Sequence, residues 1–118
     1  SIFAERALSG RPITVYGDGE QTRDFFYVGE LVELLVQALL AEQVPSGAVN
    51  VGRNQAVSLL QLLQAIEQVL GRLPAVTHVA PRAGDIRHSR ADNRRLLAHY
   101  SVPLETPLVD GLACLLGR

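Results

Sequence analysis

Two segments of the chain carry side chains that could hold an anionic ligand. The first is residues 17–24, GDGEQTRD, where two glycines permit a tight turn and a close approach of the backbone. Arg23 follows that turn, and a guanidinium can hold a phosphate with two parallel hydrogen bonds. The alternative is a plain hairpin turn in which Arg23 pairs with a neighbouring carboxylate. Spacing alone favours this alternative.

The second segment is residues 81–89, PRAGDIRHS, which follows a predicted strand. It places Arg82, Gly84 and Asp85 within four residues. An arginine there can bind a phosphate, and an aspartate can accept hydrogen bonds from ribose hydroxyls. The alternative is a solvated polar loop, which the pattern alone favours. If both segments bind, they could converge on one diphosphate.

Other chemistries find less support in the sequence. His78, His88 and His99 are too far apart in sequence to form a metal site on one helix face, so each is expected at or near the surface. Ser89 is adjacent to His88, but adjacency in sequence does not make a catalytic triad. Cys114 stands in an apolar helical run, which predicts a thiol in the core. No catalytic, metal-binding or cofactor-binding residue is expected in this chain.

The elements that must position these segments alternate between helices and short strands, which is typical of an α/β chain. Ser58 is a good helix N-cap, Gly71 ends the same helix, and Pro107 fits the first turn of a last one. The predicted helices cover residues 2–9, 30–42, 58–70, 92–100 and 108–116. The predicted strands cover residues 12–16, 25–28, 48–52 and 75–80.

Composition limits the function classes. A length of 118 residues suits one small domain, 1–118, and a net charge of −1 gives no general attraction to nucleic acid or to an anionic membrane. All eleven basic residues are arginine. One cysteine and no long apolar run predict a reducing, cytoplasmic setting without a membrane span. The chain opens without Met in a helical pattern, so it is expected to be a fragment.

The two segments together resemble the paired signatures of the NAD-dependent epimerase/dehydratase family, the extended short-chain dehydrogenase/reductases. The stretches that carry the resemblance are VYGDGEQTRDFFYVGELV, AVNVGRNQAVSLLQLLQAIEQVLG, PRAGDIRHSRAD and TPLVDGLACLL, which span most of the chain. The third stretch is more similar to UDP-glucose and UDP-N-acetylglucosamine 4-epimerases than to dehydratases or decarboxylases. The resemblance implies a small C-terminal substrate domain with four to five helices, without the Rossmann nucleotide-binding core.

The resemblance also implies roles for individual residues. Arg23 and Arg82 would hold the diphosphate of a UDP-sugar, and Asp85 would accept from the ribose hydroxyls. Val15 and Tyr16 would lie along the uracil. The sequence departs from the family at Glu30, where the pattern YVxDL more often has aspartate.

The chemistry that the family performs needs a Tyr-x-x-x-Lys pair and a glycine-rich turn for the dinucleotide. The chain has no lysine, and no third glycine follows Gly17 and Gly19 at the required spacing. NAD is therefore expected in the full-length enzyme and not on this chain, whose partners would be a UDP-sugar and a missing N-terminal Rossmann domain. Two alternatives remain: a stand-alone, non-catalytic nucleotide- or protein-binding domain, and part of a dehydratase or decarboxylase. Apolar surface left bare would also permit homo-oligomers.

Overall fold

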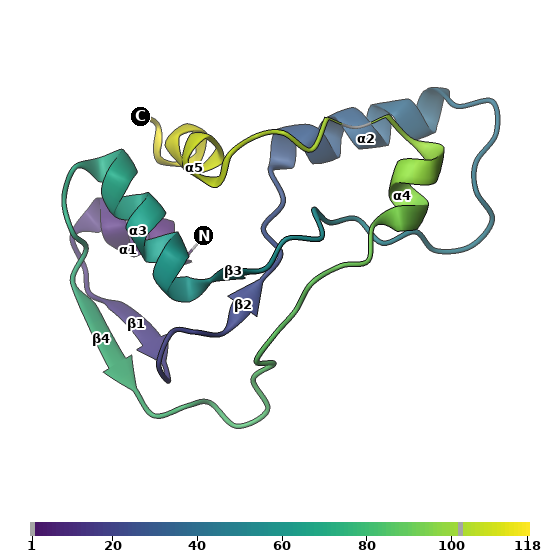
Figure 1. Cartoon of the computed structure of the whole chain (residues 1–118). Helices are drawn as coiled ribbons and strands as arrows, with labels where there is room; N and C mark the ends of the chain where they lie inside the picture. Colours follow the sequence, from purple (N-terminus) through teal and green to yellow (C-terminus); the bar gives the residue numbers. More distant parts are fainter. Residues whose placement is uncertain (1, 102) are drawn as a thin grey trace.

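Helices and short strands alternate along the chain in a computed structural model that describes residues 2–101 and 103–118 (Figure 1). The helices are α1 (Ile2–Ser9), α2 (Val28–Leu40), α3 (Leu59–Leu70), α4 (Arg94–His99) and α5 (Leu108–Leu116). The strands are β1 (Ile13–Tyr16), β2 (Thr22–Arg23), β3 (Val57–Ser58) and β4 (Val76–Val79). β1 pairs with β4 in parallel, and β2 pairs with β3 antiparallel. The mixed α/β class and the five helices agree with the sequence-based prediction.

Two predicted strands are wrong. Residues 25–27 are irregular, and Val28 is the first residue of α2, because the extended segment lies earlier, at β2. Residues 48–52 form no strand either. Their apolar character suggested a buried strand, but Val51 is 42% exposed, and no described strand pairs with them. An apolar run of this length becomes a strand only where a neighbouring strand satisfies its backbone groups.

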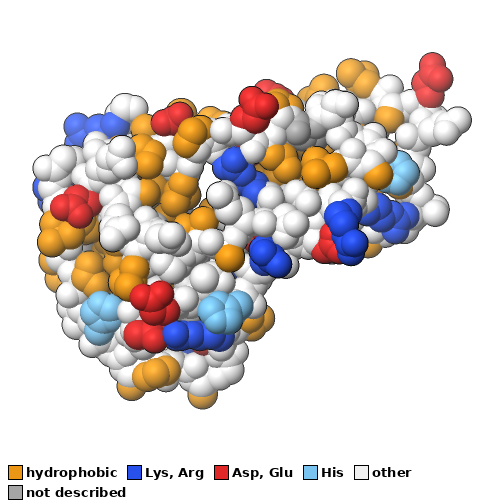
Figure 2. All heavy atoms as spheres, in the orientation of Figure 1, with side chains coloured by type: hydrophobic (Ala, Val, Ile, Leu, Met, Phe, Trp, Pro, Cys, Tyr) orange, Lys and Arg blue, Asp and Glu red, His pale blue; other side chains and the backbone are white. Residues whose placement is uncertain are grey.

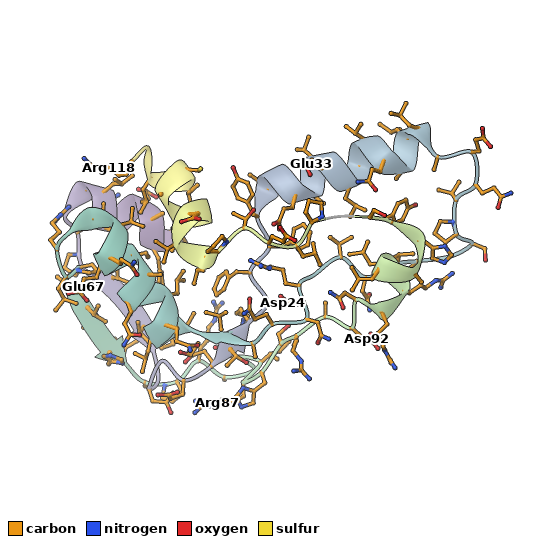
Figure 3. All side chains as sticks on the ribbon, turned by 45° about the horizontal axis from the view of Figure 1, so that its top comes forward. Asp24, Glu33, Glu67, Arg87, Asp92 and Arg118 are labelled. Carbon is orange, nitrogen blue, oxygen red and sulfur yellow. The ribbon has the colours of Figure 1, made fainter. Side chains whose placement is uncertain are left out.

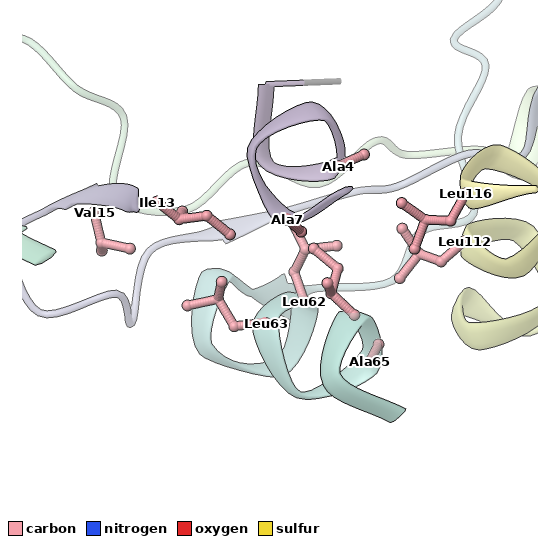
Figure 4. Close-up of a cluster of buried hydrophobic side chains, with 10 residues drawn as sticks. Ala4, Ala7, Ile13, Val15, Leu62, Leu63, Ala65, Leu112 and Leu116 are labelled. Atoms are coloured by element: carbon pink, nitrogen blue, oxygen red, sulfur yellow. The ribbon is translucent and has the colours of Figure 1, made fainter. Parts of the chain in front are cut away.

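The main core joins α1, α3 and α5 to β1 (Figure 4). Ile13, Val15 and Ile66 are fully buried in it. Helix α3 supplies more of the apolar side chains than any other element because its leucines and Ile66 recur at helical spacing. Its ends form as predicted: Ser58 makes a capping box with Gln61, and Gly71 is left-handed at the C-cap.

The opposite end of the molecule, with α2 and α4, has only a small core. Leu34 and Leu96 are its fully buried side chains. The radius of gyration is 16.3 Å, whereas a compact chain of this length would have about 13.5 Å. Apolar side chains along one face of α2 remain exposed, Leu39 by 83%. Their periodic spacing predicted a buried face, and within the described residues nothing covers it. That residues 1–118 form one domain stays a prediction.

The turn after β1 rests on the start of α3. The amide of Leu60 donates to the carbonyl of Gly19 at 3.2 Å, and the amide of Leu59 donates to the carbonyl of Gln21 at 3.2 Å. Gly19 has φ +83°, and a Cβ there would lie 2.7 Å from Cδ2 of Leu60. Glycine is therefore required both for the backbone conformation and for the close packing. The first of the two segments, residues 17–24, is consequently fixed to the main core.

An ion pair joins this turn to the segment after β4. The Arg87 guanidinium donates to both carboxylate oxygens of Asp18, at 2.7 and 2.8 Å. The guanidinium, together with the amide of Glu20, lowers the pKa of Asp18 from 3.8 to about 2. The pair thus links the two segments that the sequence singled out.

Replacing Ser58 by alanine should lower the free energy of unfolding by about 1 kcal/mol, because its hydroxyl accepts from an amide that has no helical partner. Urea denaturation followed by far-UV circular dichroism measures the change. Ser46→Ala, in an exposed loop, is the matched control and should change little. Equal losses in both variants would contradict the capping role.

Replacing Arg87 by glutamine should return the pKa of Asp18 toward 3.8, because its strongest hydrogen-bond donor is removed. A depressed carboxyl pKa means that the pair stabilises the fold above pH 3.8 and that this contribution disappears as the pH falls toward 2. NMR titration of the carboxyl carbons measures both values. Asp92, whose pKa is lowered to about 2 by Arg94, should not change in this variant. An Asp18 that titrates near 3.8 in the wild-type chain would refute the pairing.

Candidate nucleotide-binding site

The two segments singled out by the sequence, residues 17–24 and 81–89, meet at one end of the β1–β4 pair. Because β1 and β4 run parallel, the chain leaves both strands at the same end. The amide of Thr22 donates to the carbonyl of Arg87 at 2.9 Å, and the amide of Ser89 donates to the carbonyl of Thr22 at 3.1 Å. Figure 2 shows acidic, basic and histidine side chains gathered along this lower edge of the molecule. Segments more than sixty residues apart therefore form one charged surface.

Arg23 is held by contacts to the second segment. Its guanidinium donates to Oδ1 of Asp85 at 2.7 Å and to the carbonyls of Ile86 and Thr22 at 2.7 and 2.8 Å. The pairing with a carboxylate that spacing favoured is therefore present, and it joins two predicted binding residues. The Arg23 and Asp85 side chains are 32% and 36% exposed. A guanidinium carries more N–H donors than these three contacts use, so Arg23 can still receive a ligand.

The other three predicted residues are placed differently. Arg82 is exposed in the turn after β4, where its carbonyl accepts from the amide of Asp85 at 3.2 Å. Tyr16 ends β1 with 46% of its surface exposed. The side chain of Val15 is fully buried in the core, so only its backbone could reach a ligand. The structure thus brings Arg23 and Asp85 into direct contact, keeps Arg82 and Tyr16 open to solvent, and withdraws the Val15 side chain.

Asp24 is a residue of this region whose role the sequence reasoning missed. Its carboxylate accepts from the backbone amides of Arg53, Asn54 and Gln55 at 3.1, 3.0 and 3.4 Å. It also accepts from the amide of Ala91 at 3.1 Å. Figure 3 shows Asp24 near the middle of the molecule, where these segments run together. Sequence offered only a weak signal, a carboxylate followed directly by three aromatic residues.

Glu30 has a defined role although it departs from the family pattern. It lies in the first turn of α2, is only 4% exposed, and accepts from the amide of Thr106 at 2.8 Å. Arg53 also contacts the segment before α5, because its guanidinium donates to the carbonyls of Leu104 and Thr106. The longer glutamate side chain therefore fixes the approach to α5 and does not cap α2, whose N-cap has no side-chain hydrogen bond.

A separate hollow of about 560 Å³ lies between α5 and the start of α2. It is lined mainly by apolar side chains, including Phe3, Phe25 and Leu115. Cys114 also lines it and is exposed, so the prediction of a core thiol is wrong: the thiol lies on the side of α5 that faces away from Leu112 and Leu116. A hydrogen bond with Cys114 raises the pKa of Tyr27.

The start of α3 does not fit the pyrophosphate of a dinucleotide. The bare Cα of Gly19 is packed against Leu60, and the first amides of α3 already donate to Gly19, Gln21 and Ser58. A pyrophosphate would need those amides open. In the described ranges no three His, Cys, Asp or Glu side chains gather as metal ligands, and all three histidines are exposed. Within the same ranges no helix has the length and apolar character that a membrane crossing requires.

Comparison with known proteins shows what the chain is similar to. Residues 1–52 match the model of the NAD dependent epimerase/dehydratase family. UDP-glucose 4-epimerase of Mycolicibacterium smegmatis is 34% identical over 116 residues, which cover 96% of this chain and 36% of that protein. UDP-glucuronic acid decarboxylase 1 of Xenopus tropicalis is 37% identical over 112 residues, covering 95% and 26%. The chain thus spans about a third or less of the length of these relatives.

A solved structure of UDP-glucose 4-epimerase from Thermotoga maritima, with UDP-glucose, superposes with a TM-score of 0.87 at 28% identity. The superposition covers 98% of this chain and 37% of that enzyme. The similarity therefore extends over β1, β4 and the two segments that follow them. The chain is thus similar, over about a third of their length, to enzymes such as UDP-sugar 4-epimerases, and its first 52 residues match the NAD dependent epimerase/dehydratase family.

Proposed function

We propose that this chain is the UDP-sugar-binding, C-terminal part of an NAD-dependent UDP-sugar 4-epimerase. The observation that carries the proposal is the meeting of the two segments, which brings Arg23 and Asp85 together beside the exposed turn of Arg82. Arg23 and Arg82 would bind the diphosphate, and Asp85 the ribose hydroxyls. Tyr16, exposed at the end of β1, and the backbone of Val15 would lie along the uracil.

In such an enzyme, binding of the nucleotide contributes indirectly to catalysis. Binding energy from the UDP moiety, which does not react, holds the substrate while the sugar turns over between oxidation and reduction. This chain offers no Tyr–Lys couple, because it contains no lysine, and the start of α3 does not fit the pyrophosphate of a dinucleotide. The proton and hydride chemistry would therefore belong to the part of the longer relatives that this chain lacks.

The exposed face of α2 supports a missing partner of this kind. Val28, Val32, Leu35, Val36, Leu39 and Leu40 are each 48–83% exposed along that face. Apolar patches of this extent usually mark a contact surface. Since the chain covers 36% of the Mycolicibacterium smegmatis epimerase, we assign the face to the remaining part of a full-length enzyme. We expect the reducing, cytoplasmic setting of the sequence prediction for that enzyme.

A second candidate function is the same nucleotide-binding role in a UDP-sugar decarboxylase. The identity to the Xenopus tropicalis decarboxylase, 37%, is as high as that to the epimerase, so sequence similarity alone does not separate the two reactions. We prefer the 4-epimerase because of the sequence-based resemblance of the segment PRAGDIRHS to those enzymes. A non-catalytic nucleotide-binding module would use the same residues and would differ in having no catalytic partner.

Titration of the chain with UDP tests the proposed nucleotide-binding site. We expect the wild-type chain to bind UDP weakly, because part of the pocket should come from the rest of the enzyme. Arg23→Ala and Arg82→Ala should each lower the affinity for UDP by a further factor of about ten or more, since each removes a charge-assisted contact to phosphate. Isothermal titration calorimetry measures the affinities. Arg118→Ala is the matched control, because Arg118 lies on the opposite side of the main core from Arg87 (Figure 3). Good binding that neither loop variant weakens would refute the assignment.

The isolated chain should not interconvert UDP-galactose and UDP-glucose, even with NAD added. The reason is the missing Tyr–Lys couple. A coupled assay that detects either product measures the activity, with an intact UDP-glucose 4-epimerase as the positive control. Turnover by the purified chain would refute the proposal that this chain binds the nucleotide and that the chemistry takes place elsewhere.

A further inference from the structure

We propose that Asp24 is a positioning residue. It helps to fix how the two proposed phosphate-binding segments, residues 17–24 and 81–89, lie relative to one another, without contacting the ligand. The inference rests on the proposed function of those segments. Arg23 and Asp24 are neighbours in sequence but contact different parts of the chain. Arg23 contacts Asp85 and Ile86, whereas Asp24 contacts residues 53–55 and Ala91.

The carboxylate of Asp24 joins three separate parts of the chain. Oδ1 accepts from the amides of Arg53 and Gln55, and Oδ2 accepts from the amides of Asn54 and Ala91. Hydrogen bonds to an ionised acceptor are stronger than those between neutral groups. The backbone at residues 23–24 is therefore tied to residues 53–55 and to residue 91 at once.

Ala91 is the link to the second segment. Residues 81–89 begin after β4, where the amide of Gly17 donates to the carbonyl of Val79 at 2.8 Å. Their far end is held at Ala91 by Asp24. Both ends of the segment that carries Arg82 and Asp85 are thus fixed to the segment that carries Arg23. The contact to Ala91 adds to the direct backbone bonds of Thr22 with Arg87 and Ser89, so moving the Asp24 carboxylate would loosen the far end of the second segment.

The surroundings of Asp24 leave little room for adjustment. A Cβ at Gly52 would lie 2.7 Å from Oδ2 of Asp24 and 2.5 Å from Cβ of Ala91. Asn54, one of the donors, has φ +58°, a left-handed conformation that asparagine tolerates better than most residues. The 53–55 turn is therefore shaped around the carboxylate.

A carboxylate suits this position and an amide does not. All four contacts are N–H donors, so the acceptor needs lone pairs on both side-chain oxygens. In Asp24→Asn the amide nitrogen would face at least one backbone N–H donor. The variant keeps the size of the side chain but loses part of the network.

The test compares Asp24→Asn with Asp110→Asn, a matched loss of one carboxylate at an exposed position on α5. Calorimetric titrations with UDP and with uridine are made on chains whose fold is verified by circular dichroism. We expect Asp24→Asn to bind UDP about tenfold more weakly, because misplacing binding groups by a fraction of an ångström is costly. The affinity for uridine should fall less, since uridine keeps the ribose that Asp85 would bind but lacks the diphosphate that Arg23 and Arg82 would bind.

A measurement on the wild-type chain keeps the test independent of the stability of the variant. Bound UDP should slow hydrogen exchange of the Asn54 and Gln55 amides, which bond Asp24 but lie outside both phosphate-binding segments. Absence of that slowing overturns the inference, as does an equal loss of UDP and uridine affinity in Asp24→Asn. Normal UDP binding by Asp24→Asn, with binding lost in Arg23→Ala, overturns the inference but leaves the proposed function. A wild-type chain that binds no UDP overturns both.

Discussion

The carboxylate of Asp24 and its four backbone donors form the contact on which the arrangement of the loops depends. The donors come from residues 53–55 and residue 91, and none of these segments pairs with another in a regular sheet. A half-buried carboxylate is costly unless its oxygens are satisfied, and here backbone amides satisfy both. Gly52 is the steric counterpart, because any side chain there would displace Asp24 or Ala91. One side chain thus adds to the short β2–β3 pairing and to the bridge between Thr22 and His88, which join the same regions.

Arginine side chains also join segments that are distant in sequence. Arg53 and Arg72 donate to backbone carbonyls far away in sequence, and Arg87 joins the turn after β1 to the segment after β4. A planar guanidinium can make several such contacts at once, which a lysine ammonium cannot do with the same geometry. Many of the eleven arginines are therefore structural cross-links, and only those at the meeting of the two segments are candidates for ligand binding.

The main core and the α2 end of the molecule differ in how complete they are. α1, α3 and α5 bury their apolar faces against β1, whereas α2 buries Glu30 and Leu34 and leaves most of its apolar side chains exposed. An apolar stripe at helical spacing is retained in a protein when something covers it. The incomplete end of the molecule and the partial coverage of the relatives are explained together if the chain works with the remainder of a longer enzyme.

Sequence alone determined the features that depend on local physics. Helix α3, with its Ser58 cap and its Gly71 end, follows from residue types and spacing, and the absence of lysine excludes a Tyr–Lys couple from any fold of the chain. The tertiary structure decided the rest: the pairing of Arg23 with Asp85, the exposure of Cys114, and the irregular path of residues 48–52. These features depend on which distant segments become neighbours, and that is set by packing and hydrogen bonding across the fold, which spacing along the chain does not encode.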